Sequence, residues 1–263
     1  MLVFLKLGGS LITDKTKPYT AKIDIIERIA KEIKKALKEK KDIKIIVGHG
    51  GGSFPHVSAK KYKTHKGFIN EDSKYGFCVV QNDASKLNRI VVGTFLNEGL
   101  NVISIQPSAG ALAEDGKIVR WDIKNIEMLL ENDIIPLVYG DVCLDTKKGC
   151  CIISTEEIFR YLAEKLKPEK VILVGRHIVY NKDPSKFGDA IPIKEINRDI
   201  IKEIESSLGE SNGYDVTGGM LSKVKLALEI AKYCKEVEIV SGLEEGNVKK
   251  SLLGENIGTV VRY

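Results

Sequence analysis

The sequence has no long apolar run, no metal-binding cysteine spacing and no block of like charges. Its apolar stretches fall well short of the roughly 18 residues that a membrane helix needs. The N-terminal MLVFLKLGG carries Lys6 early and has no small-residue cleavage site. The five cysteines include no C-x₂-C pair, so neither zinc nor a disulfide framework is predicted. We therefore expect an unprocessed cytoplasmic chain without a membrane partner.

The charges are mixed rather than segregated. Lys and Arg number 41 against 36 Asp and Glu, a net charge of +5, and the two signs alternate in KEIKKALKEKKDIK (residues 31–44). A nucleic-acid surface would show Lys and Arg clustered without acids between them. Nucleic acid is therefore not an expected partner, whereas a small anionic ligand is compatible with this composition.

Short apolar runs alternate with amphipathic helical patterns along the 263 residues. Strands are predicted at about 2–7, 43–48, 101–105, 134–140, 170–175 and 236–240, and helices at about 25–37, 73–98, 122–132, 155–166 and 218–234. Residues 141–154 read as a hairpin. This order predicts one α/β domain with a mainly parallel sheet covered by helices on both faces. Lys167-Pro168 suggests a boundary between an N-terminal lobe (1–167) and a C-terminal lobe (168–263).

Glycine is concentrated where strands end or helices begin. Of 24 glycines, seven form three clusters, Gly8-Gly9, residues 50–52 and Gly218-Gly219. Glycine lets the backbone approach a ligand closely and turn its N–H groups toward phosphate. The chain contains neither G-x-x-x-x-G-K-[ST] nor G-x-G-x-x-G after a strand. The pattern indicates a polyphosphate site outside the two common nucleotide-binding signatures.

Three lysines accompany these glycines. Lys6 lies inside an apolar strand two residues before Gly8, Lys15 lies on the loop beyond the first cluster, and Lys223 follows Gly219 by four residues. A lysine in an apolar strand is unusual, which marks Lys6 as functional. Glycine turns with lysines are suited to phosphoryl transfer, in which two negatively charged groups must be brought together.

The segments KLGGS (6–10), HGGGSFPH (49–56), YGD (139–141) and DVTGGMLSK (215–223) resemble the amino-acid kinase superfamily. The histidine after the glycine run, with AKKY (59–62), is similar to the isopentenyl phosphate kinases of archaea within it. IQPSA (105–109) and LLGENIGT (252–259) extend the resemblance over nearly the whole chain. It implies an open αβα sandwich with a mainly parallel sheet of about eight strands, and a homodimer.

The resemblance also implies roles for individual residues. On the ATP side, the β- and γ-phosphates and the rest of the nucleotide would be held by Lys6, Gly8, Gly9, Ser10, Gly52, Tyr180, Gly219 and Lys223. On the acceptor side, Gly51 and His56 would contact the acceptor phosphate, Lys15 would reach the transferred group, and Asp141 would orient the paired lysines. No residue is implied as a direct metal ligand, and Mg²⁺ would accompany ATP.

Three segments depart from the family pattern. Pro55 stands where relatives have glycine before the histidine, and Thr155 stands where the substrate-side SGDD motif has glycine. VGRHIVY (174–180) replaces a nucleotide-contacting segment and lacks its aspartates, although Tyr180 and Asp183-Pro184 are retained. We expect a shifted loop at Pro55 and a narrower pocket at Thr155.

The leading hypothesis is Mg-ATP-dependent phosphorylation of isopentenyl phosphate. A phosphate monoester is already ionised near neutral pH, so His56 would act as a positioning donor rather than as a general base. The acceptor's apolar part would contact the helix at 73–98, with Tyr75, Phe77, Val79 and Val80 as candidates. A kinase with another small phosphate, phosphonate or carboxylate acceptor, and a nucleotide-binding protein without turnover, are the alternatives.

Overall fold

The computed structural model describes residues 1–182, 184, 186–207 and 218–263. The helices of the described chain are α1 (Gly9–Ile12), α2 (Ile23–Glu39), α3 (Pro55–Tyr62), α4 (Glu71–Asn97), α5 (Lys124–Glu131), α6 (Thr155–Leu166), α7 (Arg198–Ser207), α8 (Gly218–Ala231) and α9 (Asn247–Leu253), with 3₁₀ turns at Thr64–Lys66 and Pro107–Ala109. None of the helices in this part of the chain has the length and apolarity needed to cross a membrane.

The main sheet has eight strands in the order β10-β12-β11-β9-β1-β2-β6-β3. Their bounds are β1 (Leu2–Leu7), β2 (Lys44–His49), β3 (Val102–Ser104), β6 (Ile135–Tyr139), β9 (Lys170–Gly175), β10 (Glu195–Ile196), β11 (Glu236–Ser241) and β12 (Thr259–Val261). Only β11 and β12 pair antiparallel. The predicted fold class is therefore confirmed. The central strand β1 pairs with β2 and β9, so one sheet joins the two sequence halves.

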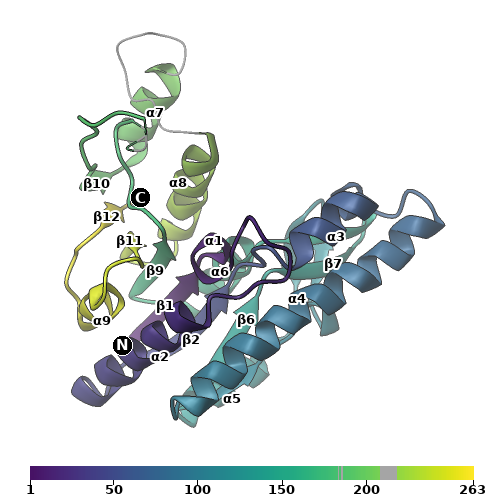
Figure 1. Cartoon of the computed structure of the whole chain (residues 1–263), viewed down its shortest axis with the longest axis horizontal. Helices are drawn as coiled ribbons and strands as arrows, with labels where there is room; N and C mark the ends of the chain where they lie inside the picture. The colour runs from purple at the N-terminus through teal and green to yellow at the C-terminus, as the bar shows by residue number, and fades with distance from the viewer. Residues whose placement is uncertain (183, 185, 208–217) are drawn as a thin grey trace.

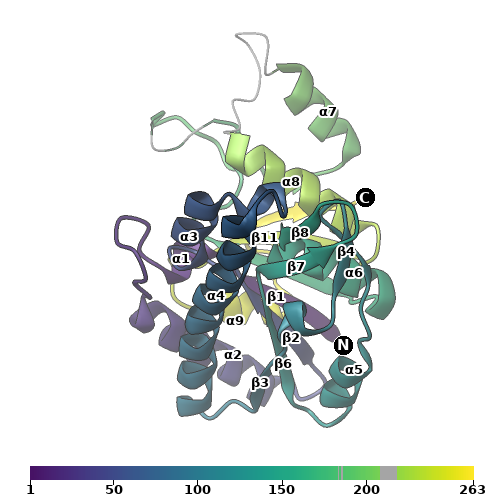
Figure 2. The same cartoon turned by 90° about the vertical axis from the view of Figure 1, so that its right-hand side faces the viewer.

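Helices cover both faces of this sheet because its strands are apolar on both sides. In β1, Val3, Leu5 and Leu7 pack in a core that contains residues of α2, α4 and α9, whereas Phe4 packs in a second core that contains residues of α5, α6 and α8. Figure 2 shows α2 and α4 to the left of β1 and β2, with α5 and α6 to the right. Alternation along a strand places Lys6 on the same side as Phe4, toward α6 and α8.

A smaller sheet extends the fold beside the carboxyl ends of the main strands. It contains β5 (Lys117–Arg120), β4 (Leu112–Glu114), β7 (Asp141–Asp145) and β8 (Gly149–Ile153) in that spatial order. The hairpin predicted at 141–154 is β7 and β8, which pair antiparallel from Asp141↔Ile153 to Asp145↔Gly149. Figure 1 shows β7 next to α3 and α4, so this sheet lies against the helices that bound the site.

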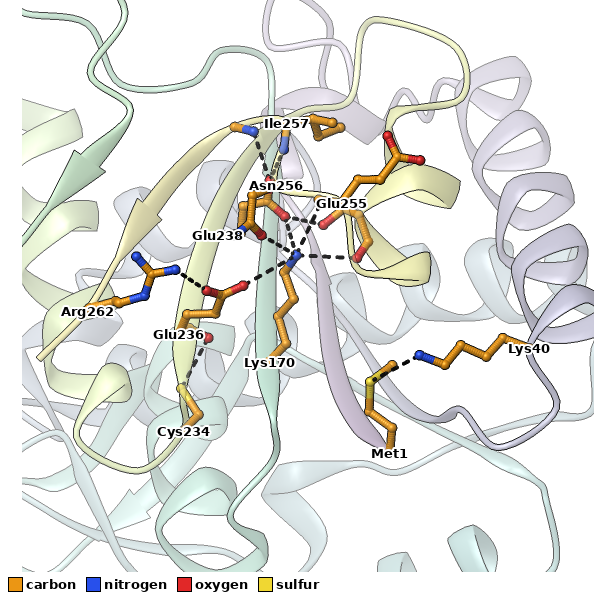
Figure 3. A network of polar contacts seen from close by, with 12 residues as sticks. Met1, Lys40, Lys170, Cys234, Glu236, Glu238, Glu255, Asn256, Ile257 and Arg262 are labelled. Atoms are coloured by element: carbon orange, nitrogen blue, oxygen red, sulfur yellow. Dashed lines mark hydrogen bonds and ion pairs between the residues drawn. The ribbon is translucent and has the colours of Figure 1, made fainter.

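A buried carboxylate anchors the C-terminal strands. Glu238 is fully buried in β11 and accepts hydrogen bonds from the N–H groups of Ile257 and Gly258 and from Ser251. Lys170 places its Nζ 2.8 Å from Glu238 and also contacts Asn256 Oδ1 at 3.0 Å (Figure 3). The pair fixes the turn from α9 into β12, because each buried charge has its partner and additional hydrogen bonds.

Replacing Lys170 with methionine should lower the free energy of unfolding by about 3 kcal/mol, because it leaves Glu238 buried without its cation. Urea unfolding followed by circular dichroism measures this difference. The matched control is Lys74→Met, which removes an exposed partner of Glu71 and should change stability by less than about 1 kcal/mol. Equal effects of the two substitutions would contradict the anchoring role of Glu238.

Candidate active site

The carboxyl ends of β1, β2 and β6 meet at one edge of the sheet, and a cavity of about 310 Å³ lies there. Its lining comes from β1, from the loops after these strands, from α1, α3, α4, α6 and α8, and from the hairpin: Lys6, Gly8, Gly9, Ser10, Lys15, Gly50, Gly51, Gly52, Pro55, His56, Ala59, Val80, Ala84, Gly140, Asp141, Ile152, Ile153, Ser154, Thr155, Glu156 and Lys223. The structure thus brings together the site residues predicted from the sequence, except Tyr180 and Gly219.

The first two glycine clusters pack directly against each other. A Cβ at Gly9 would lie 2.4 Å from the Gly52 nitrogen, so only a residue without a side chain fits at this contact. Gly52 has a positive φ of 56°, which favours glycine for a second reason. The two loops therefore present backbone, rather than side chains, to one wall of the cavity.

The loop that carries Lys15 is tied to the second glycine cluster. Thr13 and Ala21 form an isolated antiparallel β-bridge across the base of this loop. Thr13 Oγ1 accepts a hydrogen bond from Ser53 N, the residue after the second glycine cluster, at 3.0 Å. Tyr19 N donates to Ser53 O at 3.3 Å near the tip. Lys15 is exposed at the mouth of the cavity, and a wider hollow of about 750 Å³, which Lys60 and Lys61 also line, opens beside it.

Lys6 and Lys223 line the cavity from two different elements, β1 and α8. Lys6 is buried and forms an ion pair with Glu156. Burial lowers the pKa of Lys223, and the charges of Lys6 and Lys15 lower it further, while Glu156 opposes the shift. Three ammonium groups thus converge on one cavity, where they repel one another until anions enter.

Glu156 is the site residue that sequence reasoning missed. It lies in the first turn of α6, behind the N-cap Ser154, whose side chain accepts from Glu157 N. Burial opposes ionisation of Glu156, but the charge of Lys6 and the hydrogen bond from it hold the pKa of Glu156 below its usual value. The signal was the pair of acids in STEE (154–157), at the position of SGDD in relatives.

Asp141 lines the same cavity, but its carboxylate oxygens accept from Ser108 N at 3.1 Å and Val142 N at 2.8 Å. Burial raises the pKa of Asp141 in spite of these bonds. The acid that contacts Lys6 is therefore Glu156 rather than Asp141, which differs from the arrangement expected from the resemblance.

His56 projects from the first turn of α3 and lines both hollows. Burial lowers the pKa of His56, and the charge of Lys15 lowers it further, so the imidazole is neutral at neutral pH before an anion binds. Pro55 occupies the first position of α3, where its missing N–H costs no helical hydrogen bond. Pro55 is thus compatible with a helix that begins at this point and holds His56 at the cavity.

The apolar wall of the cavity differs from the predicted one. Of the four candidates only Val80 lines it, together with Ala59, Ala84, Ile152 and Ile153. Tyr75 is 64% exposed and Phe77 packs against Phe68, so the expectation for Tyr75, Phe77 and Val79 was wrong. Tyr75 and Val79 lie on other faces of α4 than Val80, whereas Phe77 lies one turn before Val80 on the same face and packs with it against Ala59 and Val142.

Thr155 is buried and lines the cavity. Its hydroxyl donates to His49 O at 2.6 Å, so this side chain is held by the end of β2. The threonine therefore adds a side chain at the position where the resemblance implies glycine, and its polar atom is satisfied within the protein.

A recess of about 30 Å³ shares Lys6, Gly8, Ser10, Glu156 and Lys223 with the main cavity and is completed by Leu173, Val174, Gly175, His177, Met220 and Ile239. It extends the cavity lined by these lysines and glycines toward β9 and α8. Gly219 is the second residue of α8, one residue before Met220.

Tyr180, the remaining residue predicted on the nucleotide side, forms an isolated bridge with Pro192 and lines neither of these hollows. Arg176 is exposed, and its carbonyl accepts from Ser241. Asp183 lies outside the described residues.

Within residues 1–182, 184, 186–207 and 218–263, no group of three or more His, Cys, Asp or Glu side chains is arranged to hold a metal ion. The two acids of the cavity are engaged, Glu156 with Lys6 and Asp141 with backbone N–H groups. This donor set fits a Mg²⁺ ion held largely by phosphate oxygens and water, which is the common mode for this cation.

Comparison with known proteins agrees with this geometry. The amino acid kinase family model matches residues 1–241. The isopentenyl phosphate kinase of Methanocaldococcus jannaschii is 38% identical over 274 residues, covering 100% of this chain and 99% of that protein. The isopentenyl phosphate kinase of Methanothermobacter thermautotrophicus is 37% identical, covering 97% of each chain.

Solved structures give the same result. One isopentenyl phosphate kinase structure superposes with a TM-score of 0.84 at 33% identity and covers 99% of this chain and 100% of that chain. A substrate complex of an isopentenyl phosphate kinase superposes with a TM-score of 0.80 at 27% identity and covers 99% of each. The chain therefore belongs to the amino acid kinase family and, within it, to the isopentenyl phosphate kinases.

Proposed function

We propose that this protein transfers the γ-phosphoryl group of ATP to isopentenyl phosphate, forming isopentenyl diphosphate and ADP, as a step of isoprenoid biosynthesis. The observation that carries the proposal is the convergence of three lysines, two glycine loops and His56 on one cavity that also has an apolar wall. Two curated isopentenyl phosphate kinases, 38% and 37% identical over nearly the full chain, support isopentenyl phosphate as the acceptor.

In this mechanism the protein's task is to bring two anions together. An oxygen of the acceptor phosphate attacks the γ-phosphorus while the bond to the β-phosphate oxygen breaks, and ADP keeps that electron pair. The acceptor is already ionised, so no residue has to remove a proton. Lys6, Lys15 and Lys223 offset the repulsion between the phosphates and stabilise the charge on the transferred group.

Each of the two lobes would bind one of the ligands. ATP would lie over Lys6, Gly8, Gly9, Ser10, Gly52, Gly219 and Lys223 toward the C-terminal lobe (168–263), with Tyr180 nearby. Isopentenyl phosphate would lie against Gly51 and His56 in the N-terminal lobe (1–167), with its hydrocarbon along Val80 and Thr155. Mg²⁺, when bound with ATP, would neutralise phosphate charge.

We also propose a cytoplasmic homodimer. Five free cysteines fit a reducing compartment. The edge strand β3 and its neighbours expose apolar side chains, Leu96, Ile103 and Met128, each about half exposed. Such residues on an unpaired sheet edge suit contact with a second copy of the chain.

A coupled assay of ADP release with Mg-ATP and isopentenyl phosphate should show turnover, with kcat/KM above that for other small phosphate monoesters, phosphonates and carboxylates. If the protein turns over only with another acceptor, it is still a kinase, but the assignment of isopentenyl phosphate as its substrate is wrong. If a non-hydrolysable ATP analogue binds and no acceptor is phosphorylated, the protein is a nucleotide-binding member without activity.

His56→Ala should lower kcat/KM for isopentenyl phosphate at least about tenfold, because a positioned hydrogen bond to a charged oxygen is worth about 1.5–3 kcal/mol. His56→Gln keeps a neutral donor and should retain more activity. His65→Ala is the matched control, since His65 is exposed and lines neither hollow. Wild-type kinetics in His56→Ala would instead indicate an acceptor that His56 does not contact.

Glu156→Gln should lower kcat at least about tenfold, because Lys6 loses its ion pair and the repulsion between Lys6 and Lys223 is no longer offset. Glu157→Gln is the control on the same helical turn. Glu157 contacts Arg160 and Ile118 N, so it should affect stability more than kcat. Steady-state kinetics below the unfolding transition compare the two, and equal loss of kcat would refute the role of Glu156.

A further inference from the structure

The second glycine loop (residues 50–52) is held by a buried histidine that precedes it. We propose that His49 is a positioning residue, which orients the Gly50-Gly51 peptide so that the Gly51 N–H faces the acceptor phosphate. This inference rests on the proposed phosphoryl transfer, because it assigns a device to the same site. His49 lines none of the hollows, so it acts through Gly50.

The imidazole has a hydrogen-bond partner on each nitrogen. Nδ1 lies 3.1 Å from Gly50 O, and Nε2 lies 3.2 Å from the Asn88 side-chain nitrogen of α4. A carbonyl oxygen can only accept, so Nδ1 carries the proton and Nε2 accepts from the amide. His49 is 1% exposed, and burial lowers the pKa of His49 to about 4, which keeps the ring neutral near pH 7.

The hydrogen bonds continue beyond Asn88, and the outer end of this hydrogen-bond chain is fixed as well. The Asn88 amide oxygen accepts from Ser104 Oγ at 2.6 Å, and Ser104 ends the edge strand β3. The direction of every bond is therefore determined, from Ser104 to Asn88 to His49 to Gly50. A buried chain in which each donor has an acceptor holds one arrangement of its groups.

Peptide geometry carries this order into the cavity. In a planar trans peptide, the C=O of one residue and the N–H of the next point in opposite directions. When Gly50 O points back to the His49 ring, the Gly51 N–H therefore points away from it. Gly50, Gly51 and Gly52 all line the cavity, so this N–H is available to a phosphate oxygen there.

His49 also connects the other loops of the site. Its carbonyl accepts from Gly140 N at 3.0 Å and from Thr155 Oγ1 at 2.6 Å. Its ring stacks on Tyr139 with an interplanar angle of 9° and a centroid separation of 5.7 Å. The loops after β2, β6 and β8, which all contribute to the cavity, thus share this residue as their common contact.

Three substitutions distinguish the contributions of the two ring nitrogens of His49. His49→Phe keeps the stacked ring and removes both nitrogens. In His49→Asn the amide nitrogen can replace Nδ1, and in His49→Gln the amide can replace Nε2. We expect KM for isopentenyl phosphate to rise at least about tenfold in His49→Phe and His49→Gln, with substantial recovery in His49→Asn, on the scale of one hydrogen bond to a charged group. KM for ATP should change less than about threefold in all three.

Thermal unfolding of each variant separates positioning from stability. Ser104→Ala alters only the outer, half-buried end of the chain and should raise KM for isopentenyl phosphate about two- to threefold, which tests the proposal if the His49 variants do not fold. Wild-type KM in folded His49→Phe, equal KM in the Asn and Gln variants, or an equal rise in both substrates' KM would overturn the proposal.

The role of His49 can be tested separately from the proposed function. If the wild-type protein does not phosphorylate isopentenyl phosphate, the proposed function fails. Titration calorimetry then measures the affinity of each variant for inorganic phosphate and tests the role of His49 by itself. Affinity in the order wild type, His49→Asn, His49→Gln supports it, and equal affinity for the three proteins overturns it.

Discussion

The ion pair between Lys6 and Glu156 is the interaction on which the site depends. Without anions in the cavity, Lys6, Lys15 and Lys223 are like charges brought into one small space, and burial, together with the charges of Lys6 and Lys15, lowers the pKa of Lys223. Glu156 is the acid in this cavity that contacts one of them. It keeps Lys6 in place before phosphate arrives, and it leaves the net charge of the lysine group positive.

The fold provides the positions that this ion pair needs. Side-chain alternation in β1 turns Lys6 toward α6, while Leu5 and Leu7 pack on the opposite face. The N-cap Ser154 begins α6 beside the carboxyl end of β1, and this places Glu156 in the first turn. A parallel sheet collects its strand ends at one edge, so loops distant in sequence meet there. The buried Lys170–Glu238 pair completes the C-terminal half of the same sheet.

The sequence was most informative where local patterns were strong. The ranges predicted for α6 and β9 agree with the structure residue for residue, because a capped amphipathic helix and an apolar strand are bounded by clear signals. The short elements α3, α9, β10 and β12 were not predicted, since their stability comes from tertiary contacts such as those of Glu238. The lysines and glycines of the site followed from residue type and resemblance. Glu156 did not, because its contact with Lys6 joins residues 150 positions apart.

Pro55 and Thr155, at which the sequence departs from the family pattern, both line the cavity and have local explanations in the structure. Pro55 begins a helix and Thr155 bonds His49 O, so neither leaves a polar group unsatisfied. In the proposed mechanism, one cavity holds two phosphates together. Calorimetric titration of isopentenyl phosphate into protein saturated with Mg²⁺ and a non-hydrolysable ATP analogue tests this directly. We expect one-to-one binding with an affinity within about tenfold of that without nucleotide, since three lysines offset the repulsion. Mutual exclusion of the two ligands would contradict it.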